Sequence, residues 1–392
     1  MADNPPSPES PRSHFPAHSE PRVWVISSGD SPIGISLTRQ ILAHGDYAVV
    51  GLVPLTLDRD EYRREQFDAF LEEVEEHSEE GWRQRLKEVV LDIRMMGQCQ
   101  AVIAEAVATF GKIDILLCCT SQAVVGTVEE LAASPRTLNL IRDQFETNYF
   151  GPVNIIKAAL PHMRRQKSGH IMVLSGITAH IGTPGLGAYC AAGWALEGFC
   201  DSIAYEIAPF NIKLTILQCS IEIGILSNLV TSVPPILPAY SPSHNHAPLF
   251  RNILNRLISR LPNVSNEAST ATDDTADSSN ANGQVDSDQN NTGANGPFSK
   301  PEVVSMYPPL STAHLEILTA ETVHALTAIG GHENPPSRHI IGQEGVASVK
   351  EKLKTVSEEL EDFIQASCAV DIVPDGDSTR GCKEDSVGNG HV

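Results

Sequence analysis

The chain has 392 residues, of which 41% are hydrophobic and 5% aromatic, and its formal net charge is −21 at pH 7. This length allows one large domain with an aliphatic core. Such an acidic chain neither neutralises a nucleic-acid backbone nor approaches an anionic membrane surface, so we expect neither partner. The sequence has no apolar N-terminal run and no stretch of about 18 apolar residues, so we expect no membrane span and a cytoplasmic location.

Composition divides the chain into three regions. Residues 1–21 are rich in Pro and Ser and are expected to form a disordered tail. Residues 22–350 are expected to form a single domain. Within it, residues 262–300 have almost no large apolar side chains and are expected to be a disordered insertion. Residues 351–392 are expected to hold a C-terminal helix and a polar tail.

The first part of the domain alternates between apolar runs and helical patterns. Val23 to Ile26 predicts a strand buried on both faces, and the helix that follows it ends near Gly45. A second strand is predicted over residues 47–53. The highly charged stretch 60–87 has aromatic and aliphatic residues at helical spacing, and residues 89–93 predict a third strand.

The rest of the domain repeats this alternation. Further strands are predicted over residues 113–118, 169–174, 212–217 and 340–341, and helices over 97–110, 134–164, 189–208, 319–330 and 346–366. Almost wholly apolar strands that alternate with helices predict an α/β fold. We expect a doubly wound, Rossmann-type parallel sheet of about seven strands flanked by helices.

The eight cysteines form no CxxC pair. Six of them lie in predicted strands and helices, where we expect small buried hydrophobic residues and neither disulfides nor metal ligands. A redox pair of Cys118 and Cys119 is the weaker alternative, because neighbours on a strand point to opposite faces. No metal site is expected.

A series of segments, in order, resembles the short-chain dehydrogenase/reductase family over about residues 22–350. The loop Ser27 to Gly34 stands where the family reads T-G-x-x-x-G-I-G, and Leu91-Asp92-Ile93 is similar to its L-D-V segment. Asp114 to Ser121 occupies the place of D-x-L-V-N-N-A-G. Phe145 to Gly151 is similar to the helix with the catalytic Asn, and Gly185 to Gly198 overlays G-x-x-x-Y-x-x-x-K-x-A-L-x-G.

The resemblance implies a catalytic group of Tyr189, Asn148 and Ser175. In the family the tyrosine moves a proton to or from the substrate oxygen while hydride moves to or from a nicotinamide. A lysine four residues later lowers the pKa of that phenol, but this chain has Gly193 there. The family serine falls at Gly176, one place after Ser175, and such a slip turns a side chain to the opposite face of a strand.

Two other residues near this position are weaker candidates. Thr178 could replace the missing serine hydroxyl, and His180 could act as an acid or base, although a lone histidine in a loop usually has no catalytic role.

The resemblance also implies an NAD(P)(H) cofactor. Gly29, Ile33 and Gly34 are the residues expected to hold it, with Asp92 at the adenine. No acid or arginine at the end of the second predicted strand selects NAD or NADP.

Two glycines of the family's loop are replaced, by Ser28 and Pro32. Pro32 adds a ring and removes an N–H group at the phosphate position. One interpretation is that Ser31 and Pro32 only start a helix, as an N-cap and a first helical residue. The alternative is that Gly29 supplies the turn and the loop still holds a dinucleotide.

These departures favour a catalytically compromised family member that acts as a binding or regulatory protein. It is expected to pair with copies of itself or with active relatives through the two long helices. The alternative is a divergent NAD(P)(H)-dependent carbonyl reductase or alcohol dehydrogenase that uses Tyr189. A third, weaker alternative is a lyase or isomerase that uses Tyr189 without hydride transfer.

Overall fold

The computed structural model describes most of the chain outside the polar insertion and the two ends. The described residues are 14–54, 61–220, 223, 227–241, 243–246, 249, 251–253, 304–306, 312–362 and 364. The insertion predicted at 262–300, the first 13 residues and the polar tail after residue 364 lie outside them.

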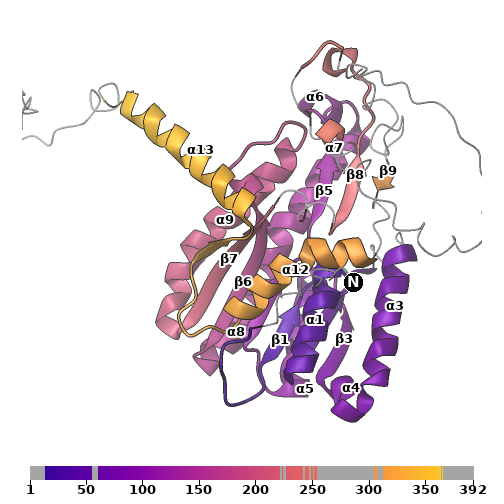
Figure 1. Ribbon diagram of the computed structural model, residues 1–392, viewed down its shortest axis with the longest axis vertical. Coiled ribbons are helices and arrows are strands. Elements are labelled where there is room, and N and C mark those ends of the chain that lie inside the picture. The colour runs from indigo at the N-terminus through magenta and orange to yellow at the C-terminus, as the bar shows by residue number, and fades with distance from the viewer. Residues whose placement is uncertain are drawn as a thin grey trace, which may run out of the picture.

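A seven-stranded sheet lies at the centre of the fold, in the order β10-β7-β6-β4-β1-β2-β3 (Figure 1). All of its neighbouring strands are parallel. The predicted doubly wound parallel sheet is therefore confirmed. Its strands are β1 (Val23–Ile26), β2 (Tyr47–Leu52), β3 (Leu86–Val90), β4 (Ile115–Cys118), β6 (Gly169–Gly176), β7 (Ile212–Cys219) and β10 (Arg338–Ile340).

Helices cover both faces of this sheet (Figure 1). The core on one face joins it to α1 (Pro32–His44), α3 (Glu61–Glu76), α4 (Trp82–Arg85) and α12 (Thr312–Ile329). The core on the other face joins it to α5 (Met96–Phe110), α8 (Gly151–Gln166) and α9 (Gly187–Ile207). Helix α13 (Gln343–Asp362) follows β10, and the short helices are α6 (Val128–Leu131), η1 (Ser78–Glu80), η3 (Ile177–Ala179), η4 (Ala208–Phe210) and η5 (Pro238–Tyr240).

The alternation of side chains along a strand supplies both cores. In β1, Trp24 and Ile26 pack toward α1 and α12, whereas Val25 packs toward α5 and α8. A strand covered on both faces needs apolar residues at every position, which is why the apolar runs in the sequence marked the strands.

Strand β3 lies three residues earlier than the apolar run predicted. It pairs with β2 from Leu86 to Val90 and forms an edge of the sheet. An edge strand tolerates polar residues such as Lys87 and Glu88. The predicted range, residues 89–93, therefore included Leu91 and Ile93, which are buried but follow the strand.

The single helix predicted over 134–164 is interrupted. Helix α7 (Pro135–Phe145) leads into a π-helical turn, η2 (Glu146–Phe150), before α8 begins. A small second sheet, β5-β8-β9, was not predicted either. It consists of β5 (Gln122–Val125), β8 (Leu229–Ser232) and β9 (Val304–Met306).

The described chain begins before the predicted domain boundary at residue 22. Phe15 contacts the ring of Trp24 edge-on, with centroids 6.3 Å apart, and His18 contacts Asp46. Residues 14–20 therefore include side chains that pack against the sheet. Within the described residues, no helix combines the length and apolar character that a membrane-spanning segment requires.

Candidate active site

The turn between β1 and α1 is packed too tightly for side chains at its glycines. A Cβ atom on Gly34 would lie 2.1 Å from the Ser28 carbonyl oxygen, and one on Gly29 would lie 2.4 Å from Val50 Cβ. Neither glycine has a positive φ. Gly29 is thus needed for the close approach of the turn to β2 and not for the positive φ that the sequence suggested. Ile33 is 2% exposed and packs in the core.

The start of α1 uses its own side chains as caps. Ser31 is the N-cap and accepts a hydrogen bond from the Gly34 N–H at 3.0 Å, and Pro32 is the first helical residue. Ser31 Oγ in turn donates to the Ser28 carbonyl at 2.7 Å. At this helix N-terminus, one N–H that would face a phosphate is already bound and another is absent.

A buried ion pair lies in the same turn. The Asp30 side chain is 0% exposed and the Arg63 side chain, from α3, is 4% exposed, with Arg63 Nε 3.0 Å from Asp30 Oδ2. Arg63 Nε also donates to the Asp30 carbonyl at 3.0 Å, and its Nη2 donates to Ser28 Oγ at 2.9 Å. Ser28 Oγ donates to the other carboxylate oxygen of Asp30 at 3.1 Å. The loop interior is therefore filled by its own polar groups.

Asp92, the residue expected at the adenine, follows β3 and is bound by Arg94. The guanidinium donates to both carboxylate oxygens, over 2.6–3.1 Å. Burial alone would raise the pKa of Asp92, but the hydrogen bonds and charge of Arg94 outweigh it and lower that pKa. Asp92 is thus an ionised partner of Arg94.

Tyr189 lies near the start of α9 and is 7% exposed. Burial raises the pKa of its phenol above the ordinary value, and the nearby Cys219 acts in the same direction. A hydrogen bond with the Ser121 side chain opposes these effects without cancelling them. The phenol therefore holds its proton more tightly than a free tyrosine, the opposite of what an acid–base catalyst near neutral pH needs.

Gly193 occupies the lysine position one helical turn after Tyr189. A Cβ there would meet only the Ala179 Cβ, at 3.7 Å. The backbone thus leaves room for a longer side chain. The glycine itself supplies no charge that could lower the pKa of Tyr189.

Asn148 lies in the π-helical turn η2, and π-turns are frequent at functional sites. Its Oδ1 accepts from the Gln122 N–H at 2.9 Å, and its Nδ2 donates to the Gln122 carbonyl at 2.8 Å. Both ends of the amide are used to hold the start of β5. Since Ser121 precedes Gln122, Asn148 positions the residue that contacts Tyr189.

Ser175 points away from this group. Its Oγ donates to Glu197 Oε1 at 3.0 Å, and Gln218 Nε2 donates to the same oxygen at 2.7 Å. Arg338 of β10 binds the other oxygen of Glu197 at 3.2 Å. This network joins β6, β7, β10 and α9, so the contacts of Ser175 in this structure are with buried charged and polar groups and not with Tyr189.

The two weaker candidates differ in position. A Cβ at Gly176 would lie 3.1 Å from Thr178 Oγ1, so the Thr178 hydroxyl lies close to where the family serine would project. His180 Nε2 lies 2.8 Å from Gln218 Nε2 and belongs to the Glu197 network. Thr178 is therefore placed better than His180 to contact a group near Tyr189.

The cysteines of the described residues are packed in the core. All six of them are buried, as predicted. Burial raises the pKa of Cys119 to about 11 and that of Cys118 well above its ordinary value. Both thiols therefore stay protonated at neutral pH, which argues against a reactive pair.

Sequence reasoning did not assign roles to Arg63 and Ser121. Arg63 was one of many charges in a helical stretch, and nothing local marked it as the partner of Asp30, 33 residues away. Ser121 did carry a signal, because it stands at the glycine of the D-x-L-V-N-N-A-G segment.

The parallel sheet, the turn at the start of α1 and the Tyr189 helix define a doubly wound α/β protein of the Rossmann type. A family model described as short chain dehydrogenase matches residues 25–223, about half of the chain. The chain belongs to this family.

Curated relatives match over the same region. Oxidoreductase BOA17 of Botryotinia fuckeliana is 30% identical over 197 residues, which cover 50% of this chain and 64% of that protein. Human retinol dehydrogenase 8 is 32% identical over 204 residues, which cover 50% of this chain and 58% of that protein. The chain thus spans less than two thirds of the length of these relatives.

A solved structure of a short-chain dehydrogenase from Streptomyces avermitilis shares the fold. It has a TM-score of 0.60 and 20% identity, and the match covers 90% of this chain and 100% of that one.

Proposed function

We propose that this chain is a short-chain dehydrogenase family member that has lost efficient hydride transfer and acts as a binding or regulatory protein. The observation that carries this proposal is the buried Asp30–Arg63 pair in the turn where a dinucleotide diphosphate would bind. The residues present do not fit that group.

The reason is electrostatic and steric. Two like unit charges roughly 4 Å apart repel by about 4 kcal/mol at an effective dielectric constant of about 20. A diphosphate in this turn would face the Asp30 carboxylate, while the Arg63 guanidinium is already paired with that carboxylate. Pro32 removes one N–H donor and Ser31 occupies another.

The residues around Tyr189, where hydride transfer is expected in the family, support the same proposal. Losing a positioned acid–base group typically costs about 10²–10⁴ in rate. Here the pKa of Tyr189 is raised by burial, and Gly193 provides no cation to lower it.

The alternative function is a divergent oxidoreductase that uses Tyr189, and one contact favours it. Ser121 hydrogen-bonds to the phenol, and Thr178 lies at the missing serine position, so two hydroxyls could bind a substrate oxygen. Since one relative is named a retinol dehydrogenase, retinal belongs in any carbonyl panel. NADPH or NADH oxidation that Tyr189→Phe abolishes would establish this alternative.

The test of the main proposal is binding of NADH and NADPH to the purified chain by thermal shift and calorimetry. A ligand at about 100 times its dissociation constant stabilises the folded state by about 2.7 kcal/mol. We expect no shift at millimolar cofactor for the native chain. The variant Asp30→Ser/Pro32→Gly removes the carboxylate from the turn and restores a main-chain N–H donor, so we expect binding at least about tenfold tighter, or about 1.4 kcal/mol.

A control for this comparison is Asp68→Ser, a change on the same helix as Arg63 that lies outside the turn. It should leave cofactor binding as in the native chain. Tight NADPH binding by the native chain would overturn the proposal.

The raised pKa of Tyr189 predicts a pH effect on stability. Above about pH 10 the unfolded chain releases the phenol proton while the folded chain keeps it, so stability falls as pH rises, by about 1.4 kcal/mol per unit for this one group. Urea unfolding at several pH values should show a shallower loss in Tyr189→Phe. Ile203→Val, a buried change on the same helix that removes no ionisable group, is the control and should keep the native slope.

We also propose that the exposed face of α9 contacts a partner, either a second copy or a relative. Trp194 is 54% exposed and Tyr205 is 85% exposed, and their spacing of 11 residues, close to three turns, puts them on one face. Large exposed apolar groups on one face commonly mark interfaces. In sedimentation velocity we expect Trp194→Ala/Tyr205→Ala to dissociate an oligomer, whereas Leu353→Ala on α13 should not. A native chain that is monomeric at all concentrations contradicts self-association.

A further inference from the structure

Three potential metal ligands lie near the amino-terminal ends of β1 and β2. The candidate active site lies near the carboxyl-terminal ends of the strands. His18 lies in the segment before β1, His44 is the last residue of α1, and Asp46 immediately precedes β2. One side-chain ligand atom from each of these three residues lies within 4.8 Å of the others. The turn after β1 is at the other end of the parallel strands, so this cluster is separate from the site described above.

We propose that His18, His44 and Asp46 form a binding site for a divalent transition metal ion, best suited to zinc. Zinc binds nitrogen and oxygen ligands at about 2.0–2.2 Å in a tetrahedron, commonly with three protein ligands and a water. Such a tetrahedron separates its ligand atoms by roughly 3.3 Å. The ligand atoms lie within 4.8 Å of one another, so they would need to approach by no more than about 1.5 Å to reach that spacing.

The hydrogen bonds of His18 show why a cation belongs there. Its Nδ1 lies 2.9 Å from the Pro16 carbonyl oxygen, which can only accept, so Nδ1 carries a proton. Its Nε2 lies 2.9 Å from the Asp46 carboxylate, which is also an acceptor when ionised. A neutral ring would place two lone pairs against each other. A metal ion bound to both Nε2 and the carboxylate would remove this repulsion.

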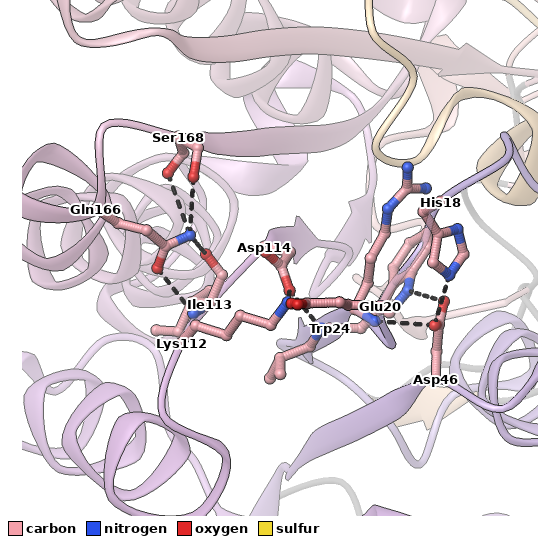
Figure 2. Close-up of polar contacts among 11 residues, drawn as sticks. His18, Glu20, Trp24, Asp46, Lys112, Ile113, Asp114, Gln166 and Ser168 are labelled. Atoms are coloured by element: carbon pink, nitrogen blue, oxygen red, sulfur yellow. Dashed lines mark hydrogen bonds and ion pairs between the residues drawn. The ribbon is translucent and has the colours of Figure 1, made fainter.

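The Asp46 carboxylate is held in a fixed orientation (Figure 2). It is 1% exposed and accepts from the Arg22 main-chain N–H at 2.9 Å and from Trp24 Nε1 at 3.3 Å. Figure 2 shows His18 and Trp24 converging on it. Hydrogen bonds of this kind orient metal ligands and usually accompany true sites.

His44 supplies the third ligand, and its side chain is exposed. The Phe15 ring stacks on it with centroids 4.1 Å apart and an angle of 12° between the planes. His44 also ends α1, where the negative end of the helix dipole favours a cation. The competing cation is Arg22, whose guanidinium is directed to the Gly330 carbonyl.

A bound metal would link the segment before β1, which carries His18, to α1 and β2. Sequence spacing did not reveal this site, because His18 lies 28 residues from Asp46. The inference uses no residue of the candidate active site and stands whether or not the chain transfers hydride.

The test uses the full chain, stripped with a chelator and titrated with Co²⁺ and then Zn²⁺. We expect one equivalent of Co²⁺ with the visible absorption of a four-coordinate site, displaced by Zn²⁺. Zn²⁺ should also slow proteolysis and hydrogen exchange in residues 14–20. His44→Ala keeps the His18–Asp46 contact and should weaken binding by at least about 100-fold, since even outer-shell changes cost about 10–100-fold.

His162→Ala, on α8, is the matched control and should bind as the native chain does. Circular dichroism of His44→Ala confirms its folding, and His44→Gln provides a second variant if needed. Absence of a stoichiometric Co²⁺ complex, or equal affinity in the native chain and His44→Ala, overturns the proposal.

Discussion

Replacing Arg63 by alanine is expected to destabilise the fold by about 3–5 kcal/mol, the usual cost of leaving a buried charge without its partner. The Asp30 side chain is 0% exposed, so water does not replace the lost guanidinium. The same substitution also removes the donors to Ser28 Oγ and to the Asp30 carbonyl. Denaturant unfolding of Arg63→Ala and the native chain measures the effect.

Two comparison variants test whether the loss of stability comes from the buried ion pair. Arg83 also forms ion pairs, with Glu75 and Glu88, but its side chain is 44% exposed, so Arg83→Ala should cost no more than about 1 kcal/mol. The double variant Asp30→Asn/Arg63→Met removes both charges together and should be far less damaging than Arg63→Ala alone. Equal losses for Arg63→Ala and Arg83→Ala would show that the pair is not the buried contact described here.

The second large effect is expected at Gly34, where alanine should cost about 3 kcal/mol or more. A Cβ would lie 2.1 Å from the Ser28 carbonyl oxygen and 2.8 Å from Gly29 Cα. Both obstacles are backbone atoms of a turn that is itself held by Ser31 and Arg63, so they cannot move aside as a side-chain end could. Overpacking of this kind typically costs about 1–3 kcal/mol even where side chains can adjust. Thermal and denaturant unfolding measure the loss.

Gly198→Ala is the control for Gly34→Ala, and it should raise the stability in the same unfolding experiments. Gly198 lies in the interior of α9, and a Cβ there would meet nothing within 4 Å. Alanine should therefore stabilise the chain by about 0.5–1 kcal/mol, the usual helical difference. A Gly34→Ala variant as stable as the native chain would mean that the turn can open, which would weaken the argument against a bound diphosphate.

The two predictions concern one feature, the closed turn at the start of α1. In this family the turn is the expected cofactor site, yet here a proline, a capping serine and an ion pair stabilise it from within. The residues that differ from the family's loop motif therefore take part in stabilising the fold of this chain.

The sequence by itself determined the fold class and the main departures at the site. Each buried parallel strand needs a short apolar run, and each helix a 3.6-residue pattern, so local order along the chain was enough to predict the sheet. Gly193, Ser28 and Pro32 were equally visible, because their distances from Tyr189 and Gly34 are counted along the chain. The alternation of side chains on a strand also indicated that Ser175 would face away from the family serine position, and it contacts Glu197.

Only the tertiary structure decided which distant side chains meet. Arg63 reaches Asp30 because the start of α3 lies beside the turn after β1, and Ser121 reaches Tyr189 because the chain after β4 lies beside α9. The π-turn at Asn148 and the second sheet depend on contacts of the same kind, such as the bond from Asn148 to Gln122, 26 residues away. Local propensity does not encode these pairings, since they follow from strand order and helix packing, which are set by the burial of the whole chain.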